Sequence, residues 1–162
     1  MGIPLNQTPI ASFFESIFKL QLNISDNQYY YHKDVLEILN HPLSGRLFEP
    51  SSIESISQSI TSNNLIHLKF SSIVKKLSPE QNIMAVALFT PWTSNNNFCV
   101  QDVNKIITYL IETTNNKVDA LLIEYLLAYR KVYNLLEKLS SAYTYIKDLK
   151  TLYRLFLSLI HI

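Results

Sequence analysis

Apolar residues recur every three or four positions along most of the chain, which is the spacing that gives an α-helix one buried face. The pattern indicates an all-α fold, an irregular bundle of about six helices. The longest periodic run covers residues 117–139, and its first half carries Ile123 and Leu127 where a polar face is expected. This helix is therefore expected to be central in the bundle.

Three helix starts are marked by residues that cap or open a first turn. Thr8 is the predicted N-cap of the first helix, with Pro9 at its first position. Ser51 and Glu54 have the spacing of a capping box. Ser78, which is followed by a proline, is the predicted cap of another helix.

Proline and asparagine mark the predicted helix ends. The residue before a proline is disfavoured in helical backbone, so Pro42 places one helix end at Asn40 and Pro91 places another near Phe89. A third helix is expected to fade by Asn63. The apolar positions of the helix before Pro42 are expected in the core; they are Val35, Leu36 and Leu39.

Residues 65–70 depart from the helical spacing and alternate between two faces. Ile66, Leu68 and Phe70 lie on one face, while Leu65, His67 and Lys69 lie on the other. A period of two is typical of a strand, so the pattern leaves open one short strand or extended coil here. The three consecutive tyrosines at 29–31 are a second candidate for extended backbone.

The charge balance restricts the possible partners. The chain has 14 basic and 13 acidic residues among 162, for a formal net charge of +1. This balance supplies no long-range field for nucleic acid or an anionic membrane, so strong DNA binding by this chain alone is not expected. Charged or polar residues interrupt every apolar run before the roughly 18 residues of a membrane span, and no secretory signal is found. We expect a soluble, cytoplasmic protein.

No pattern of residue types indicates a catalytic residue, a metal ligand or a cofactor site. The four histidines have no metal-ligand spacing among themselves or with a carboxylate. Cys99 is the single cysteine, and its place at the entrance to an apolar helix is typical of a small core residue. The chain is therefore predicted to be noncatalytic, without a cofactor of its own.

Two aromatic features have a functional interpretation beside a structural one. The tyrosines at 29–31 could stack on bases, as aromatic platforms do in proteins that bind single strands. Their few basic neighbours favour packing in the core or at its rim instead. Trp92 could anchor a partner, although a tryptophan that closes one end of a bundle is the favoured interpretation.

Five cations are the candidate nucleic-acid-binding residues. Lys147, Lys150 and Arg154 form a narrow basic stripe on the last predicted helix, residues 146–160, roughly opposite its apolar stripe. Lys75 and Lys76 form a second, weaker pair. Such side chains can bind phosphates, although an ordinary solvated face is the commoner reason for a stripe of this size.

Four stretches resemble AddB-like superfamily 1 helicase–nucleases, PD-(D/E)XK nuclease family proteins of Bacteroidetes type. "MGIPLNQTPI" resembles that family's "N-[IV]-T-M-G-x-P-L-x-x-T-P-[IV]", without its first asparagine. "YYYHKDVLEILNHPL" is similar to "YY-[YH]-K-D-V-L-x-[LI]-L-x-H-P". "LFTPW" at 88–92 and "IKDLKTLYRLFLSLI" at 146–160 look like two further family stretches. The likeness runs from end to end.

The resemblance implies a place within a longer protein. Residues 1–22 would begin the second helicase motor domain, and residues 23–162 would form a helical 2B-like accessory domain, truncated at its C-terminal end. The ATP-binding motifs would precede Met1 and the nuclease would follow Ile162, so ATP and magnesium are expected for the parent protein. The implied partners are DNA, the neighbouring helicase domains and a partner helicase–nuclease subunit. No catalytic residue of the family falls in this chain.

Three functions are compatible with the sequence. The first is a noncatalytic accessory domain of a DNA-repair helicase–nuclease, which orients duplex DNA and contacts the motor domains. The second is an independent α-helical protein-interaction domain, whose apolar strip from Leu155 to Ile162 docks a partner. The third is an enzyme with a site assembled only by folding, of which the sequence gives no sign.

Overall fold

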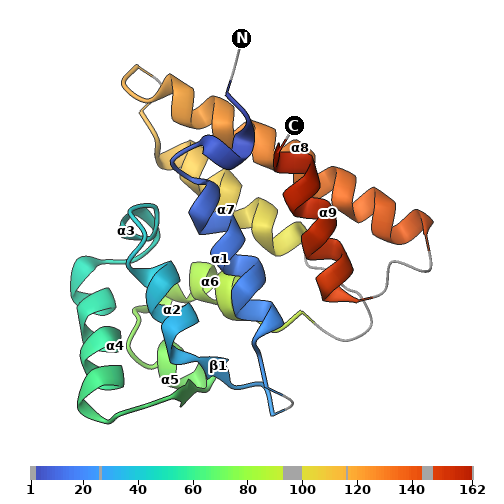
Figure 1. The fold of residues 1–162 in the computed structure, drawn as a ribbon. Coiled ribbons are helices and arrows are strands. Elements are labelled where there is room, and N and C mark those ends of the chain that lie inside the picture. Colours follow the sequence, from blue (N-terminus) through green and yellow to red (C-terminus); the bar gives the residue numbers. More distant parts are fainter. Residues whose placement is uncertain (1–2, 26, 93–99, 116, 144–147, 162) are drawn as a thin grey trace. The chain divides into compact units, whose positions relative to one another are not determined.

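Helices make up most of the structure, a computed structural model that describes residues 3–25, 27–92, 100–115, 117–143 and 148–161 (Figure 1). The predicted all-α fold is confirmed. The described residues form nine α-helices, the 3-10 helix η1 and two strands of two residues each. The helices outnumber the predicted six in part because α3 (Ser44–Leu47) and α5 (Phe70–Val74) are too short to show a period in the sequence.

The chain divides into two compact units. We call Phe13–Pro91 the middle unit, and Met1–Ser12 together with Trp92–Ile162 the terminal unit. This division does not follow the boundary after residue 22 that the family resemblance implies. That boundary refers to the domains of a longer protein, and it stays a prediction.

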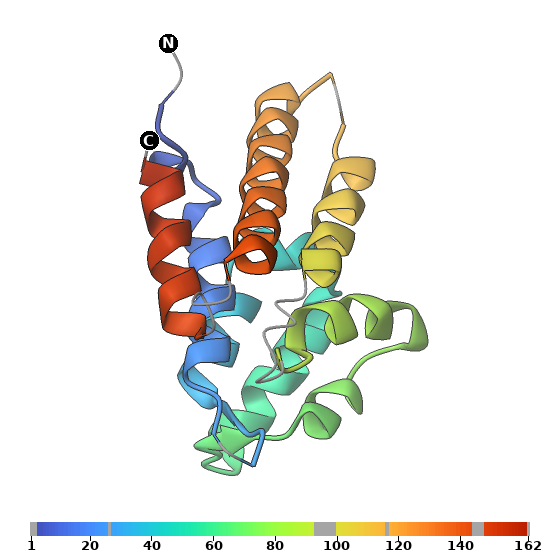
Figure 2. The same ribbon diagram turned by 90° about the vertical axis from the view of Figure 1, so that its right-hand side faces the viewer.

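The terminal unit is built around α8. Its elements are η1 (Leu5–Gln7), α7 (Val100–Thr113), α8 (Ala120–Ala142) and α9 (Leu149–His161). Within this unit α8 lies between α7 and α9 and contacts both (Figure 2). The rings of Tyr129 and Tyr133 on α8 pack on Phe156 of α9, with centroids 6.3 and 5.5 Å apart, and all three are buried. The Tyr129 hydroxyl also donates to the Leu5 carbonyl at 2.9 Å, which attaches η1 to α8.

Only one face of α8 is buried. That face consists of Leu126, Tyr129, Tyr133 and Leu136. As expected for a central helix, α8 lies between two others. The expectation that apolar residues all round the helix would be buried was wrong for Leu127, which is 42% exposed. Leu121 and Leu135 are also exposed, at 57% and 41%. These three leucines of α8 are therefore at the surface of this chain.

The middle unit begins with the aromatic residues of α1. Its elements are α1 (Ala11–Leu22, from Phe13 onward), β1 (Tyr30–Tyr31), α2 (His32–Leu39), α3, α4 (Pro50–Ser62), β2 (His67–Leu68), α5 and α6 (Pro79–Phe89). Phe13, Phe14 and Phe18 of α1 are fully buried. On α2, Val35 and Leu39 are buried as predicted, but Leu36 is half-exposed and Ile38 is the third core residue.

The predicted helix ends are confirmed. Asn40 and Asn63 cap the C-terminal ends of α2 and α4. α6 ends at Phe89, two residues before Pro91. The stop at Phe89 could be predicted because proline restricts the backbone of the residue before it, which needs no tertiary contact.

Helix starts were predicted less well. Ser78 is the N-cap of α6, as predicted, but two other starts were wrong. α4 begins at Pro50, which fits the first position of a helix, so Ser51 already lies inside the first turn and forms no capping box. α1 begins at Ala11, and the Thr8 hydroxyl donates to the Leu5 carbonyl at 2.7 Å instead of capping α1.

Tyr30 connects β1 to the end of α6. Its ring is fully buried, lies 6.1 Å from the Phe89 ring, and its hydroxyl donates to the Phe89 carbonyl. The next carbonyl, that of Thr90, accepts a hydrogen bond from Gln21 Nε2 at 3.1 Å. The last carbonyls of a helix have no partner within the helix, and Pro91 has no N–H to offer. Two side chains from elsewhere in the middle unit therefore satisfy this helix end.

The Tyr30→Phe variant is expected to lose about 1–3 kcal/mol of unfolding free energy, because it leaves the buried Phe89 carbonyl without its hydroxyl donor while the ring is kept. Urea unfolding measures the change. Tyr31→Phe is the matched control, since Tyr31 is half-exposed, and it should change stability by less than about 0.5 kcal/mol. Equal stabilities of the two variants would contradict the role given to the Tyr30 hydroxyl.

Candidate functional site

The exposed face of α9 carries two of the predicted phosphate-binding cations. Lys150 and Arg154 are four residues apart, so they lie on one side of the helix, and both are exposed. The buried stripe of α9 lies roughly opposite and consists of Leu152, Phe156 and Ile160. Lys147, the third predicted member, lies outside the described residues. α9 thus presents a pair of cations to solvent.

Asp148 offsets part of this positive charge. Its Oδ1 accepts a hydrogen bond from the Thr151 amide at 2.6 Å, at the start of α9. The bond to Thr151 lowers the pKa of this carboxyl, and the positive charges of Arg154 and Lys150 lower it further. Asp148 is therefore a helix-capping carboxylate within the field of the two cations.

Lys75 and Lys76 lie at the other predicted position, just after α5 in the middle unit. Both are exposed, and Lys75 is the residue that caps the end of the helix. Cations are favoured at the C-terminal end of a helix, where the last carbonyls carry partial negative charge. These lysines are therefore accessible, and they belong to a different unit from Lys150 and Arg154.

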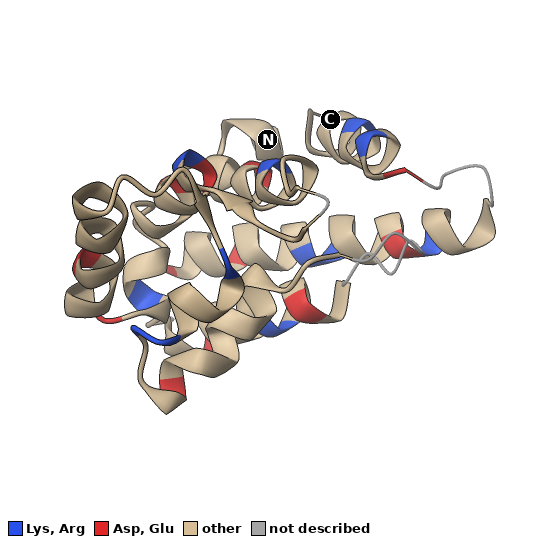
Figure 3. Ribbon diagram, turned by 90° about the horizontal axis from the view of Figure 1, so that it is seen from below, with Lys and Arg blue, Asp and Glu red and all other residues tan. Residues whose placement is uncertain are grey.

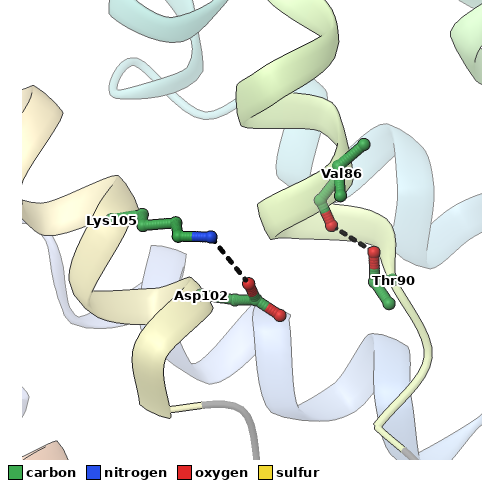
Figure 4. A network of polar contacts seen from close by, with 4 residues as sticks. All are labelled: Val86, Thr90, Asp102 and Lys105. Atoms are coloured by element: carbon green, nitrogen blue, oxygen red, sulfur yellow. Dashed lines mark hydrogen bonds and ion pairs between the residues drawn. The ribbon is translucent and has the colours of Figure 1, made fainter.

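Acidic and basic residues are interspersed among the helices, as Figure 3 shows for the described residues. On α9 the cations follow a carboxylate, and on α7 Asp102 pairs with Lys105 at 3.9 Å (Figure 4). Figure 4 also shows the Thr90 hydroxyl, which donates to the Val86 carbonyl at the end of α6. Both contacts of Figure 4 join residues three or four apart. They stabilise single helices and assemble no site.

The strands β1 and β2 bring together residues that are far apart in the sequence. They pair antiparallel, with Tyr30 opposite Leu68 and Tyr31 opposite His67. Tyr30 and Leu68 are buried, whereas Tyr31 is half-exposed and His67 is exposed. Since strand residues alternate between faces, Tyr29 and Lys69 continue the outer side. We call these outer residues the ribbon face: Tyr29, Tyr31, His67 and Lys69.

The side chains of the ribbon face are in mutual contact. The Tyr31 ring meets the His67 ring edge to face, with centroids 6.1 Å apart and planes at 88°. The Lys69 Nζ lies over the Tyr29 ring, 5.2 Å from its centre, in the geometry of a cation–π contact. The ring of His32, the first residue of α2, lies 4.8 Å from that of Tyr31. The result is a small cluster of aromatic rings beside an exposed ammonium group.

Backbone bonds fix both ends of β1. Ser25 and Tyr29 bond reciprocally, because the Ser25 amide donates to the Tyr29 carbonyl and the Ser25 hydroxyl accepts from the Tyr29 amide, each at 3.1 Å. After β1, the His32 amide donates to the Ile66 carbonyl at 2.9 Å. Gln28 enters the strand with a φ of 63°, a left-handed conformation that turns the chain sharply. The ribbon face is therefore held from both ends.

Both strands of this cluster had a signal in the sequence, but their pairing did not. Both segments were predicted to be extended, and the alternation of residues 65–70 placed His67 and Lys69 on one side, as the structure confirms for the described strand. The pairing of that strand with the tyrosines was not predicted. Ile66 was expected on the same side as the buried Leu68, but it is 61% exposed.

Burial is the main cause of the perturbed titratable groups in the core. It raises the pKa of the Tyr30 and Tyr133 hydroxyls well above the usual range. It also raises the pKa of Asp34, which a hydrogen bond from Asn23 Nδ2 at 2.9 Å lowers and the nearby Glu37 raises. The shift of each group is explained by its own packing and hydrogen bonds.

The histidines have separate structural contacts. His41 Nδ1 accepts from the Leu43 amide at 3.1 Å, and a ring nitrogen of His161 bonds Asn6 at 2.9 Å. Within the described ranges, no three His, Cys, Asp or Glu side chains are grouped to hold a metal ion. Cys99 lies outside these ranges.

The predicted apolar docking strip at 155–162 is partly enclosed. Phe156 and Ile160 are buried within the terminal unit, while Leu155, Leu157 and Leu159 are half-buried. Trp92 is also half-buried, which fits the predicted packing role better than a side chain exposed for binding a partner. In the part of the chain that is described, every helix is too short or too polar for a membrane span.

Comparison with known protein families, curated proteins and solved structures gives no match to this chain. The family resemblance of the sequence therefore stays a hypothesis.

The Asp34→Asn variant is expected to be more stable than the parent chain at pH 7. Folding raises the pKa of this carboxyl, so the folded chain binds the proton more tightly and stability falls as the pH rises through the folded-state pKa. Asparagine carries no charge and can still accept the bond from Asn23. Near pH 3, below the ordinary carboxyl pKa of about 3.9, the gain should disappear. Thermal unfolding at both pH values measures the effect.

Asp148→Asn is the control, for which stability at pH 7 is expected to change in the opposite direction. The pKa of Asp148 is lowered by folding, so its charge stabilises the folded chain above the unfolded-state pKa, and that stability is lost as the pH falls through the folded-state pKa. This variant should be less stable at pH 7. Shifts of the same sign in both variants would contradict the assignment.

Proposed function

We propose that this chain is a noncatalytic accessory domain of a cytoplasmic DNA-repair helicase–nuclease, which orients duplex DNA and contacts the motor domains. A sequence resemblance, which is itself a hypothesis, and the fold class support the proposal. The sequence resembles the AddB-like helicase–nucleases over its whole length, and the fold is all-α, as a 2B-like domain is expected to be. In this proposal ATP and magnesium act in the parent protein, and DNA reaches the chain through that protein.

The DNA-binding role in this proposal rests on the exposed pair Lys150 and Arg154. Duplex DNA is held through its phosphates by placed cations, and such contacts position a protein without reading sequence. The two side chains lie on the solvent side of a helix whose opposite side is anchored by Phe156 and Ile160. A rigid helix therefore presents them. Lys75 and Lys76 are accessible for the same role on the middle unit.

Charge removal on α9 tests this role. In the Lys150→Gln/Arg154→Gln variant, the slope of log affinity against log salt for a short DNA duplex should decrease by about 2, since each lost phosphate contact changes it by about 0.9. Fluorescence anisotropy at salt concentrations from about 50 to 200 mM measures the slope. The nearly neutral chain is expected to bind weakly, so the titration begins at low salt.

Lys131→Gln/Lys138→Gln is the matched control, because it removes the same charge from exposed positions on α8 of the same unit. It should leave the slope nearly unchanged. An equal loss in both variants would mean that only net charge matters, and unchanged binding in the α9 variant would remove the phosphate role of this helix.

The coding sequence on either side tests the helicase–nuclease assignment. We expect a G-x-x-x-x-G-K-[ST] motif upstream, whose backbone amides cradle phosphates, and nuclease carboxylates downstream. Sequencing outward from the coding region decides the point. A start codon at Met1 together with a stop codon after Ile162 would contradict it.

A protein-interaction domain is the second candidate, and the exposed leucines of α8 favour it. Leu121, Leu127 and Leu135 are each more than 40% exposed. Large apolar side chains exposed to solvent can mark an interaction surface. Sedimentation at increasing concentration should then show self-association, which Leu127→Lys would reduce. A monomer at all concentrations, purified without a partner, would remove this candidate.

A further inference from the structure

We propose that the ribbon face binds single-stranded nucleic acid, with unpaired bases stacked on Tyr29 and Tyr31 and a phosphate held by Lys69. This site is distinct from the duplex contacts proposed for α9. It lies on the middle unit and uses rings as well as charge, so either proposal can fail without the other.

The fold places these rings outside and keeps them there. Tyr30 and Leu68, the inward pair, are 0% and 4% exposed, and they anchor the two strands in the core. Strand alternation then directs Tyr31 and His67 outward. The inner pair therefore anchors the ribbon, and the half-exposed Tyr31 is held at the surface, where a base can reach it.

The rings beside Tyr31 are not stacked on it. His67 meets Tyr31 at 88° and His32 meets it at 71°, so both contacts are edge to face, while Lys69 lies over one face of Tyr29. Stacked rings would cover each other instead. A base needs one open aromatic face, and base–aromatic stacking is independent of sequence because every base has such a face.

The local charge suits a polyanion. Residues 65–79 contain three lysines and one histidine and no carboxylate. Lys69 and Lys33 are both exposed. The two carboxylates of α2 are hydrogen-bonded to neutral donors, since Asp34 accepts from Asn23 and Glu37 Oε1 accepts from the Ser16 hydroxyl at 3.1 Å. Such bonds leave the charge of a carboxylate in place, so the cationic side of the ribbon is the segment of Lys69.

Unpaired bases fit this surface better than a duplex. Bases within a duplex are already stacked on their neighbours, so a protein ring reaches them only at an end or after unpairing. A strand with free bases can offer rings to Tyr29 and Tyr31 and a phosphate to Lys69 together. The ribbon is short, and we expect it to engage two or so nucleotides.

Binding of a fluorescein-labelled oligothymidine of about 12 nucleotides to the full chain tests the proposal. Tyr31→Ala should weaken the affinity by roughly 5- to 100-fold, the loss expected for one stacked base, while Tyr31→Phe should bind nearly as the parent does because the ring is kept. Lys69→Gln should lower the salt slope by about 0.7, the value for one phosphate of a single strand.

Tyr143→Ala is the matched control, because Tyr143 is a 46% exposed tyrosine of the terminal unit, and its loss should leave the affinity unchanged. Circular dichroism and thermal unfolding establish that each variant folds. Equal binding by Tyr31→Ala and Tyr31→Phe would overturn the proposal, and so would a parent chain that does not bind the oligonucleotide at low salt. Equal affinity for single strands and duplex, unaffected by Tyr31→Ala, would assign binding to cations alone and also overturn it.

Photocrosslinking locates the contact without relying on a variant. An oligonucleotide that carries 5-iodouracil reacts on irradiation with an aromatic side chain stacked on it. Mass spectrometry of the digested chain should find the adduct on Tyr29 or Tyr31, or on His67 of the paired strand. Crosslinks confined to the terminal unit would contradict the site.

Discussion

The middle unit depends on one buried phenol. Tyr30 fills the space beside Phe89 with its ring and satisfies the carbonyl of the same residue with its hydroxyl. A helix that ends in the interior has carbonyls with no partner of its own, and an unsatisfied buried carbonyl costs about 1–3 kcal/mol. A phenylalanine at position 30 would supply only the packing, and a polar residue only the bond. Tyrosine supplies both, and it joins β1 to α6.

The same residue determines which of its neighbours are available for function. Once Tyr30 points inward, the two-residue period of a strand directs Tyr29 and Tyr31 outward, and the antiparallel register sets His67 beside Tyr31. The terminal unit has a comparable division on α9, where Phe156 and Ile160 are buried and Lys150 and Arg154 are exposed. In each unit the buried residues position exposed residues whose chemistry suits a nucleic acid, through rings in one and through cations in the other.

Local features of the fold could be predicted from the sequence, whereas contacts between distant segments could not. The helix end at Phe89 could be predicted because proline restricts the backbone of the residue before it. The capping box at Ser51 failed because Pro50, one residue earlier, fits the first helical position better. The sequence shows that residue 127 is apolar, but whether another helix covers its side of α8 depends on the tertiary fold.

The candidate sites divide in the same way. The cations at Lys150 and Arg154 could be found because they share one helix, whose period relates them. The ribbon face could not, since Tyr31 and His67 are 36 positions apart and their contact needs the strand register, which no local pattern sets. The tyrosine run and the alternating segment 65–70 could each be recognised in the sequence. Their adjacency is a property of the fold.

The alternation along β1 and β2 separates two kinds of constraint on the sequence. Substitutions at Tyr30 or Leu68 change the interior, so they affect folding whatever the chain binds. Substitutions at Tyr29, Tyr31, His67 or Lys69 change a surface that rests on those two residues. A lineage could therefore vary the outer residues, and with them the ligand, while the scaffold stays intact. The ribbon is a place where new binding properties can evolve at little risk to the fold.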